Sequence, residues 1–238
     1  MAIRNRFLAF FYRLGLLAIA GYAVYLLFSY RALPDEWSRG FYFFDCQTLL
    51  VAFAVILSEV IANGIGLGKK TNGIVPGVWS PIFLATLSFV LFESIAYPIV
   101  SLATGASYFV YKDGSYAVMI LSKIVIPFLL LLDYLLFGEK GTVKWKHPIF
   151  WSLYPLFYFA FILLVQQIFG QQFVIVSFFR PSTFSASNAF LAGNGGWNGV
   201  VISSFAAWTG YIAFAYLIVF LNFVFAGAYR KRTPSDVI

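Results

Sequence analysis

Histidine, cysteine and charged side chains are scarce in this 238-residue sequence, and each scarcity excludes a class of protein. The only cysteine, Cys46, cannot form an internal disulfide or a CxxC metal or redox site. The only histidine, His147, has no second imidazole with which to build a His-rich zinc or haem site. Charged residues make up 11% of the chain, too few to cover the surface of a soluble domain. We therefore expect an integral membrane protein with no bound metal and no cofactor.

Apolar residues dominate instead, at 61% hydrophobic and 21% aromatic, with a mean hydropathy of +0.86. A membrane-spanning helix needs about 20 mostly apolar residues, and six stretches of about that length divide the chain. They lie at about residues 8–30, 44–66, 79–103, 116–138, 148–169 and 203–228. The first is too long for the apolar core of a signal peptide, so we expect a retained helix. The sequence predicts an all-α polytopic membrane protein, one six-helix bundle over residues 1–238.

The 16 Lys and Arg residues, which give a net charge of +7, predict the orientation of the chain. Eleven fall on one side of the predicted membrane and four on the other, while Lys123 lies within a span. The larger group is Arg4, Arg6, Arg13, Lys69, Lys70, Lys140, Lys144, Lys146, Arg230, Lys231 and Arg232, and the smaller group is Arg31, Arg39, Lys112 and Arg180. Because cytoplasmic loops carry the excess of cations, we predict a cell-membrane protein with both termini in the cytoplasm. Its positive charge indicates topology and contact with membrane lipids rather than nucleic-acid binding.

One predicted outer connection, residues 170–202, is much longer than the others. Loops of that length without secondary structure are usually functional or disordered. Within this connection, Arg180 is a candidate contact for an anionic ligand.

Ionisable residues inside predicted spans are candidates for function, because they are expensive to bury in a membrane. They are Glu59, Glu93, Lys123 and Asp133, with Asp45 at the outer edge of the second span. A rise of ~1.5 Å per residue places Lys123 about 10 Å and Glu93 about 15 Å below the outer boundary. We expect Glu93 or Asp45 to pair with Lys123, since a buried lysine without a counter-ion would lose its proton. Such a pair either holds helices together or lines a path for substrate or protons. Glu59 and Asp133 either reach the cytoplasmic interface or cap a neighbouring group.

The stretch from Lys123 to Phe161 carries a family resemblance. It combines Pro127, the run LLDYLLF at 131–137, a basic Lys140-Gly141 loop, Trp151 and the sequence YPLFY at 154–158. This order resembles bacterial six-helix relatives of the androgen-induced-gene family, which includes the androgen-dependent regulator of tissue factor pathway inhibitor. FFDCQTLLVA at 43–52 is similar to the second helix of that family, more weakly.

The resemblance implies a six-helix bundle that hydrolyses fatty-acyl esters with a threonine near the start of the second helix and a histidine in the fourth. This sequence departs from that pattern at both positions. The threonine position falls on Phe44 or Asp45, and the histidine position falls at or next to Lys123. A residual route is Thr48 as nucleophile with a desolvated Lys123 as general base. A carboxylate paired with Lys123 would keep the ammonium protonated and remove that base.

Three functions follow from these observations. The first is a diverged or inactive relative of the hydrolases that binds an amphipathic, fatty-acyl or lipid ligand in a pocket lined by Asp45, Thr48, Glu93 and Lys123. The second is a non-enzymatic transport or substrate-binding component with an unidentified protein partner. The third is a structural membrane protein whose Lys/Arg clusters only set its topology. We expect the first, without catalysis by the family mechanism.

Overall fold

The computed structural model describes residues 3, 5–31, 44–68, 75–104, 116–169 and 197–230, and within these ranges it is helical, without strands. The helices are α1 (Arg6–Arg31), α2 (Phe44–Leu67), α3 (Ser80–Thr104), α4 (Tyr116–Ile120), a π-helical turn η2 (Leu121–Val125), α5 (Ile126–Phe137), α6 (His147–Trp151), α7 (Leu153–Phe169) and α8 (Trp197–Arg230). α4, η2 and α5 form one continuous rod, and α6 leads into α7 through a turn at Ser152.

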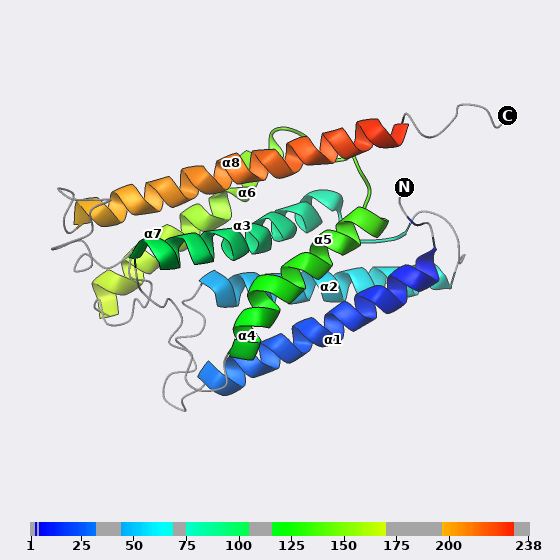
Figure 1. Ribbon diagram of the computed structural model, residues 1–238, viewed down its shortest axis with the longest axis horizontal. Coiled ribbons are helices and arrows are strands. Elements are labelled where there is room, and N and C mark those ends of the chain that lie inside the picture. The colour runs from blue at the N-terminus through cyan, green and yellow to red at the C-terminus, as the bar shows by residue number, and fades with distance from the viewer. Residues whose placement is uncertain are drawn as a thin grey trace.

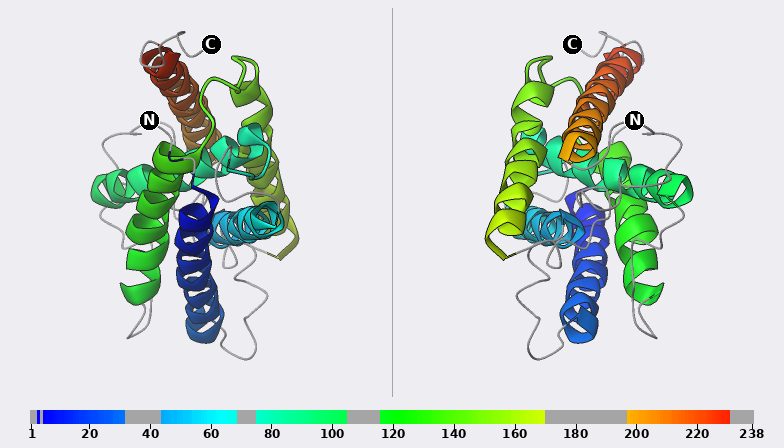
Figure 2. Two further views of the ribbon diagram at one scale, coloured as in Figure 1. Left: turned by 90° about the vertical axis from the view of Figure 1, so that its right-hand side faces the viewer. Right: turned by 90° about the vertical axis from the view of Figure 1, so that its left-hand side faces the viewer.

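The helices, with α4–η2–α5 and α6–α7 each taken as one unit, run roughly along the long axis of the molecule and alternate in direction. As a result, α1 begins and α8 ends at the same end of the molecule (Figure 1). We call this the α1-start end of the bundle; α2 and α5 also end there, and α3 begins there. α3 lies between α2 and α8 and contacts both of them, as well as α5 (Figures 1 and 2). α1 packs chiefly against α2 and also touches α5.

Within the described residues, five helical stretches are long and apolar enough to cross a membrane. They are Arg6–Ser29, Cys46–Leu67, Ala117–Phe137, His147–Val165 and Gly199–Gly227, and they match five of the six predicted spans. The remaining predicted span coincides with α3, in which the described stretch Ser80–Ala96 is apolar. Large apolar side chains such as Ile65, Phe157 and Ile168 are exposed on the outside of the bundle, as a lipid-facing surface requires.

The predicted outer connection 170–202 is too long at its C-terminal end. Residues 197–202 belong to α8, and Val200 is fully buried there. The Ser/Asn/Gly-rich composition hid the start of the helix, because Asn198 and Gly199 follow Trp197 and the continuous apolar run begins only at Val200. Residues 170–196, which include Arg180, lie outside the described part of the chain.

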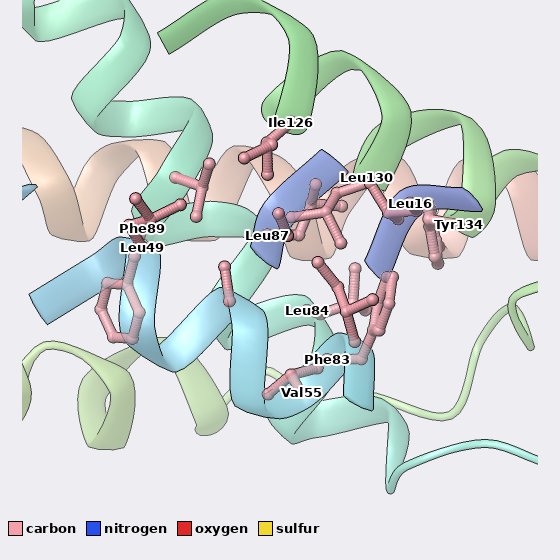
Figure 3. Packing of buried hydrophobic residues seen from close by; sticks show 14 of the residues in the cluster. Leu16, Leu49, Val55, Phe83, Leu84, Leu87, Phe89, Ile126, Leu130 and Tyr134 are labelled. Atoms are coloured by element: carbon pink, nitrogen blue, oxygen red, sulfur yellow. The ribbon is translucent and has the colours of Figure 1, made fainter. Parts of the chain in front are cut away.

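The inside of the bundle is an apolar cluster shared by α1, α2, α3 and α5. Leu16, Leu49, Leu84, Leu87 and Leu130 are each at most 4% exposed and belong to this cluster (Figure 3). Burying such side chains contributes roughly 1.5–3 kcal/mol each relative to water. In a membrane the gain comes mainly from close packing, because lipid tails are themselves apolar.

The turn η2 is explained by the proline that follows it. Pro127 has no N–H, and in a regular α-helix its ring would collide with the carbonyl of Lys123 four residues earlier. Here the N–H of Ile126 bonds to the carbonyl of Leu121, five residues back, which widens the helix just before the proline. This wide turn carries the buried Lys123 into the bundle.

The connection between α5 and α6 depends on one glycine. Gly141 has φ of +80°, a left-handed conformation, and an added Cβ would lie 2.8 Å from the Cβ of Ala226 in α8. Its N–H donates to Asn222 Oδ1 at 3.0 Å, and the same oxygen accepts the Tyr134 hydroxyl at 2.7 Å. Asn222 thus ties this connection and α5 to α8.

We predict that Gly141→Ala destabilises the protein by about 1–3 kcal/mol, because the new Cβ is strained and strikes Ala226. Thermal unfolding of the detergent-solubilised protein measures this. Gly15→Ala is the control: Gly15 lies in α1 with nothing within 4 Å of an added Cβ, so its melting temperature should stay the same or rise. Equal melting temperatures for Gly141→Ala and the unaltered chain would contradict the prediction.

Candidate functional site

Thr48 of α2, Glu93 of α3 and Lys123 of η2 meet in one hydrogen-bonded group, which we call the Glu93 network. The Thr48 hydroxyl donates to Glu93 Oε2 at 2.5 Å, and Lys123 Nζ forms an ion pair with Glu93 Oε1. Thr48 is 2% exposed, and the side chains of Lys123 and Glu93 are 5% and 15% exposed. The structure thus brings together three of the four residues expected to line an outer pocket. Asp45, the fourth, lies in the first turn of α2, and its side chain is outside the described part.

The arrangement of the Glu93 network argues against a catalytic dyad in which Thr48 is the nucleophile and Lys123 the general base. Lys123 is the cation of an ion pair with the Glu93 carboxylate. An ammonium cannot take the proton of Thr48. The remaining acceptor at the Thr48 hydroxyl is the Glu93 carboxylate, which is already paired with Lys123.

A second charged group lies toward the α1-start end, centred on Arg13 of α1, and we call it the Arg13 network. Arg13 Nε donates to Asp133 Oδ1 at 2.9 Å and Nη2 to Asp133 Oδ2 at 3.2 Å, a two-pronged pair with α5. Arg13 Nη1 donates to the carbonyl of Pro76 at 2.9 Å and lies 2.6 Å from Glu59 Oε2 of α2. All three ionised side chains are at most 4% exposed.

The segment before α3 closes around Glu59. The N–H of Val78 donates to Glu59 Oε1 at 2.9 Å. A Cβ on Gly77 would lie 2.4 Å from Glu59 Oε2, so only glycine allows the carboxylate to approach this backbone. Charges removed from water to this degree need partners with good geometry, and each charged member of the network has at least one.

Arg13 corrects the sequence interpretation. It was counted with Arg4 and Arg6 as a cation outside the membrane, but it is 3% exposed inside a candidate span. The count failed because it placed Arg13 with the loop cations although the predicted span 8–30 contains it, and α1 begins at Arg6, which places Arg13 two turns inside the helix. Glu59 and Asp133 accordingly cap a neighbouring group, the Arg13 guanidinium. The signal was available: an arginine well inside an apolar stretch, with two acids at the matching depth of the second and fourth spans.

A cavity of about 450 Å³ adjoins the Arg13 network, within the size range of small-molecule sites. α1, α2, α3, α5 and the segments that follow α2 and α5 contribute to its wall, through side chains that include Arg13, Glu59, Asp133, Glu139, Trp79, Phe83, Tyr134 and Phe137. Trp79 is 66% exposed, so the cavity reaches the surface. Thr48, Glu93 and Lys123, expected to line a pocket, are not among its lining residues.

Lys140 stands beside this cavity, just after α5. Its ammonium donates to the carbonyls of Tyr134 and Gly138 and lies 3.7 Å from the centre of the Tyr134 ring. Burial lowers the pKa of Lys140 to about 8, while the Asp133 charge acts in the opposite direction. Lys140 therefore serves as a cation at the end of α5, where carbonyl groups lack helical partners.

The single histidine has a local structural role. His147 Nδ1 accepts the N–H of Lys144 at 2.9 Å, and the ring stacks near Trp151. Among the described residues, no group of three His, Cys, Asp or Glu side chains is placed to hold a metal ion.

We predict that Arg13→Met destabilises the protein by about 3–5 kcal/mol, because it leaves two buried carboxylates without their cation. Unfolding in mixed detergent and SDS, followed by circular dichroism, measures the loss.

Combining Arg13→Met with Glu59→Gln and Asp133→Asn removes all three charges, and we expect the triple variant to recover part of that stability. If Arg13→Met unfolded at the same SDS fraction as the unaltered chain, the ion pairs would not support the bundle.

Comparison with known proteins returns no similarity that could assign a function. No family model, no curated protein and no solved structure matches this chain. The two networks and the cavity therefore carry the functional argument.

Proposed function

We propose that this protein is a six-span membrane protein that binds an amphipathic or lipid ligand and does not hydrolyse it. The observation that carries the proposal is the position of the Glu93 carboxylate, in contact with both the Thr48 hydroxyl and the Lys123 ammonium. A diverged relative of the androgen-induced-gene family would have exchanged its threonine and histidine for this stable ion pair. The apolar outer surface and the cavity at the α1-start end support ligand binding in a membrane.

The proposed sixth span is α3, which runs through the middle of the bundle beside α2 and α8. With six spans, both termini lie on one side, and the excess of cations at the α1-start end favours the cytoplasm.

A transport or substrate-binding component is the second candidate, and the Arg13 network favours it. Ionisable groups inside membrane spans often mark paths for substrates or protons. Here such a group lines a cavity that reaches the surface. A protein that copurifies in a one-to-one ratio would favour this candidate over a solitary ligand-binding protein.

Purified protein should show no turnover of fatty-acyl esters that depends on Thr48 or Lys123, because neither is free to act as nucleophile or base. We expect the unaltered chain, Thr48→Ala and Lys123→Ala to give the same background rate against a panel of such esters. Native mass spectrometry of the unaltered chain should detect a retained amphiphile.

A rate well above background that is lost in both variants would establish the hydrolase instead. A chain that retains no amphiphile, even after incubation with membrane lipid extract, would remove the ligand-binding proposal.

The proposed orientation predicts a labelling pattern for introduced cysteines. Lys112→Cys, in a predicted outer connection, should react with a membrane-impermeant maleimide on intact cells, and Lys144→Cys should react only after permeabilisation. The native Cys46 is 2% exposed and provides the unlabelled background. The reverse pattern would place the termini outside.

A further inference from the structure

Among the described residues, the wall of the cavity at the α1-start end has more acidic than basic side chains. Its described ionisable lining residues are one cation, Arg13, and three carboxylates, those of Glu59, Asp133 and Glu139. Lys140 lies beside Tyr134 and is not among the lining residues; counting it still leaves one carboxylate in excess. Glu139 is exposed to solvent, whereas Glu59 and Asp133 are buried and both face the buried Arg13. This wall therefore favours a positive ligand group over a negative one.

Arg13 is not free to receive an anionic ligand. Its Nε and Nη2 groups are held by Asp133, and its Nη1 group is shared between the Pro76 carbonyl and Glu59. An anion entering the cavity would have to displace one of these partners and would meet the carboxylates. The positive charge in the wall is thus already used within the protein.

Glu59 keeps acceptor capacity that the protein does not use. Its Oε1 atom accepts the N–H of Val78, and Oε2 is ion-paired with Arg13 Nη1 at 2.6 Å, so each oxygen has one partner in the protein. The residue is 3% exposed and lines the cavity. An ionised carboxylate can accept about four hydrogen bonds, so Glu59 can take an N–H donor from a ligand.

The rest of the wall suits a cation with an apolar body. Trp79, Phe83 and Phe137 line the cavity beside the carboxylates. Aromatic faces attract ammonium groups, with tryptophan the strongest, and the effect grows when water is excluded.

We propose that this cavity binds the ammonium group of an amine-bearing ligand, with Glu59 as hydrogen-bond acceptor and Trp79 as part of the aromatic wall. The inference rests on the proposed function, that the protein binds an amphipathic ligand, and assigns the chemistry of the polar end of that ligand.

The test compares four probes on the purified protein in detergent at pH 7, by isothermal titration calorimetry. Hexylammonium, 1-hexanol and hexanoate share a six-carbon chain and differ in charge, while methylammonium has the charge without the chain. Hexylammonium should bind at least about tenfold more tightly than hexanol and hexanoate, as one charge-assisted hydrogen bond would provide. Similar affinities of hexylammonium and methylammonium would identify a soluble amine, and a preference for hexylammonium an amphiphile; both support the inference.

Two variants place the binding at the cavity. Glu59→Gln and Trp79→Leu should each weaken hexylammonium binding severalfold. Trp145→Leu is the matched control, since Trp145 is also exposed and aromatic but stacks on Tyr216 and Phe223, outside the cavity lining. If Glu59→Gln fails to fold, the probe series and the tryptophan pair still decide.

Three results would overturn the inference. Hexanoate binding as tightly as hexylammonium would mean that Arg13 receives the ligand, and equal binding of hexanol would mean an apolar site. In both cases the proposal of an amphipathic ligand would survive. Binding of none of the four probes would overturn the inference and also count against ligand binding at this cavity.

Discussion

The pairing of Arg13 with Asp133 and Glu59 is the interaction on which the α1-start end of the bundle depends. A guanidinium inside a membrane-spanning helix is tolerated only where its donors meet acceptors and the bundle shields it from lipid. Here these acceptors come from α2, α5 and the segment before α3, so one side chain fixes α1 against three other parts of the chain. The requirement to satisfy Arg13 also positions Pro76, Gly77 and Val78 over the end of the bundle, and the cavity forms between them and α5.

The two charged networks lie along the same side of α2, between α2 and the rod formed by α4, η2 and α5. Thr48 and Glu59 are eleven residues apart on α2, which is close to three full turns, so both face the same direction ~16 Å apart. Lys123 and Asp133 lie in that rod, Lys123 in η2 and Asp133 in α5. α3 supplies Glu93 to one network and α1 supplies Arg13 to the other. The space between α2 and this rod, which α1 and α3 fill, is therefore polar toward both ends and apolar between them, where Leu130 and Val55 belong to one buried cluster (Figure 3).

How far the sequence could predict the molecule differs between these features. Hydropathy and length predicted an all-helical chain, because about 20 apolar residues in a row have few alternatives in a membrane. Depth arithmetic was enough to suggest Glu93 as a partner for Lys123, since both positions are measured from the same boundary. Arg13 was misassigned although the sequence carried the signal, because it was counted with the loop cations Arg4 and Arg6 while lying inside the predicted span 8–30. The cavity depends on how residues 75–79 fold over Glu59, which no periodic pattern encodes.

The π turn at Leu121–Val125 sets the angle, about the helix axis, between the directions in which Lys123 and Asp133 point. Lys123 and Asp133 share one rod, and each residue of an α-helix advances the direction of its side chain by about 100°. The wide turn absorbs one residue more than an α-helical turn, so everything after it is rotated relative to everything before it. Loss of a single residue there would turn Asp133 away from Arg13 while leaving Lys123 close to its place. A single-residue deletion or insertion at this turn is therefore a route by which evolution could uncouple one network from the other without changing any of the charged residues.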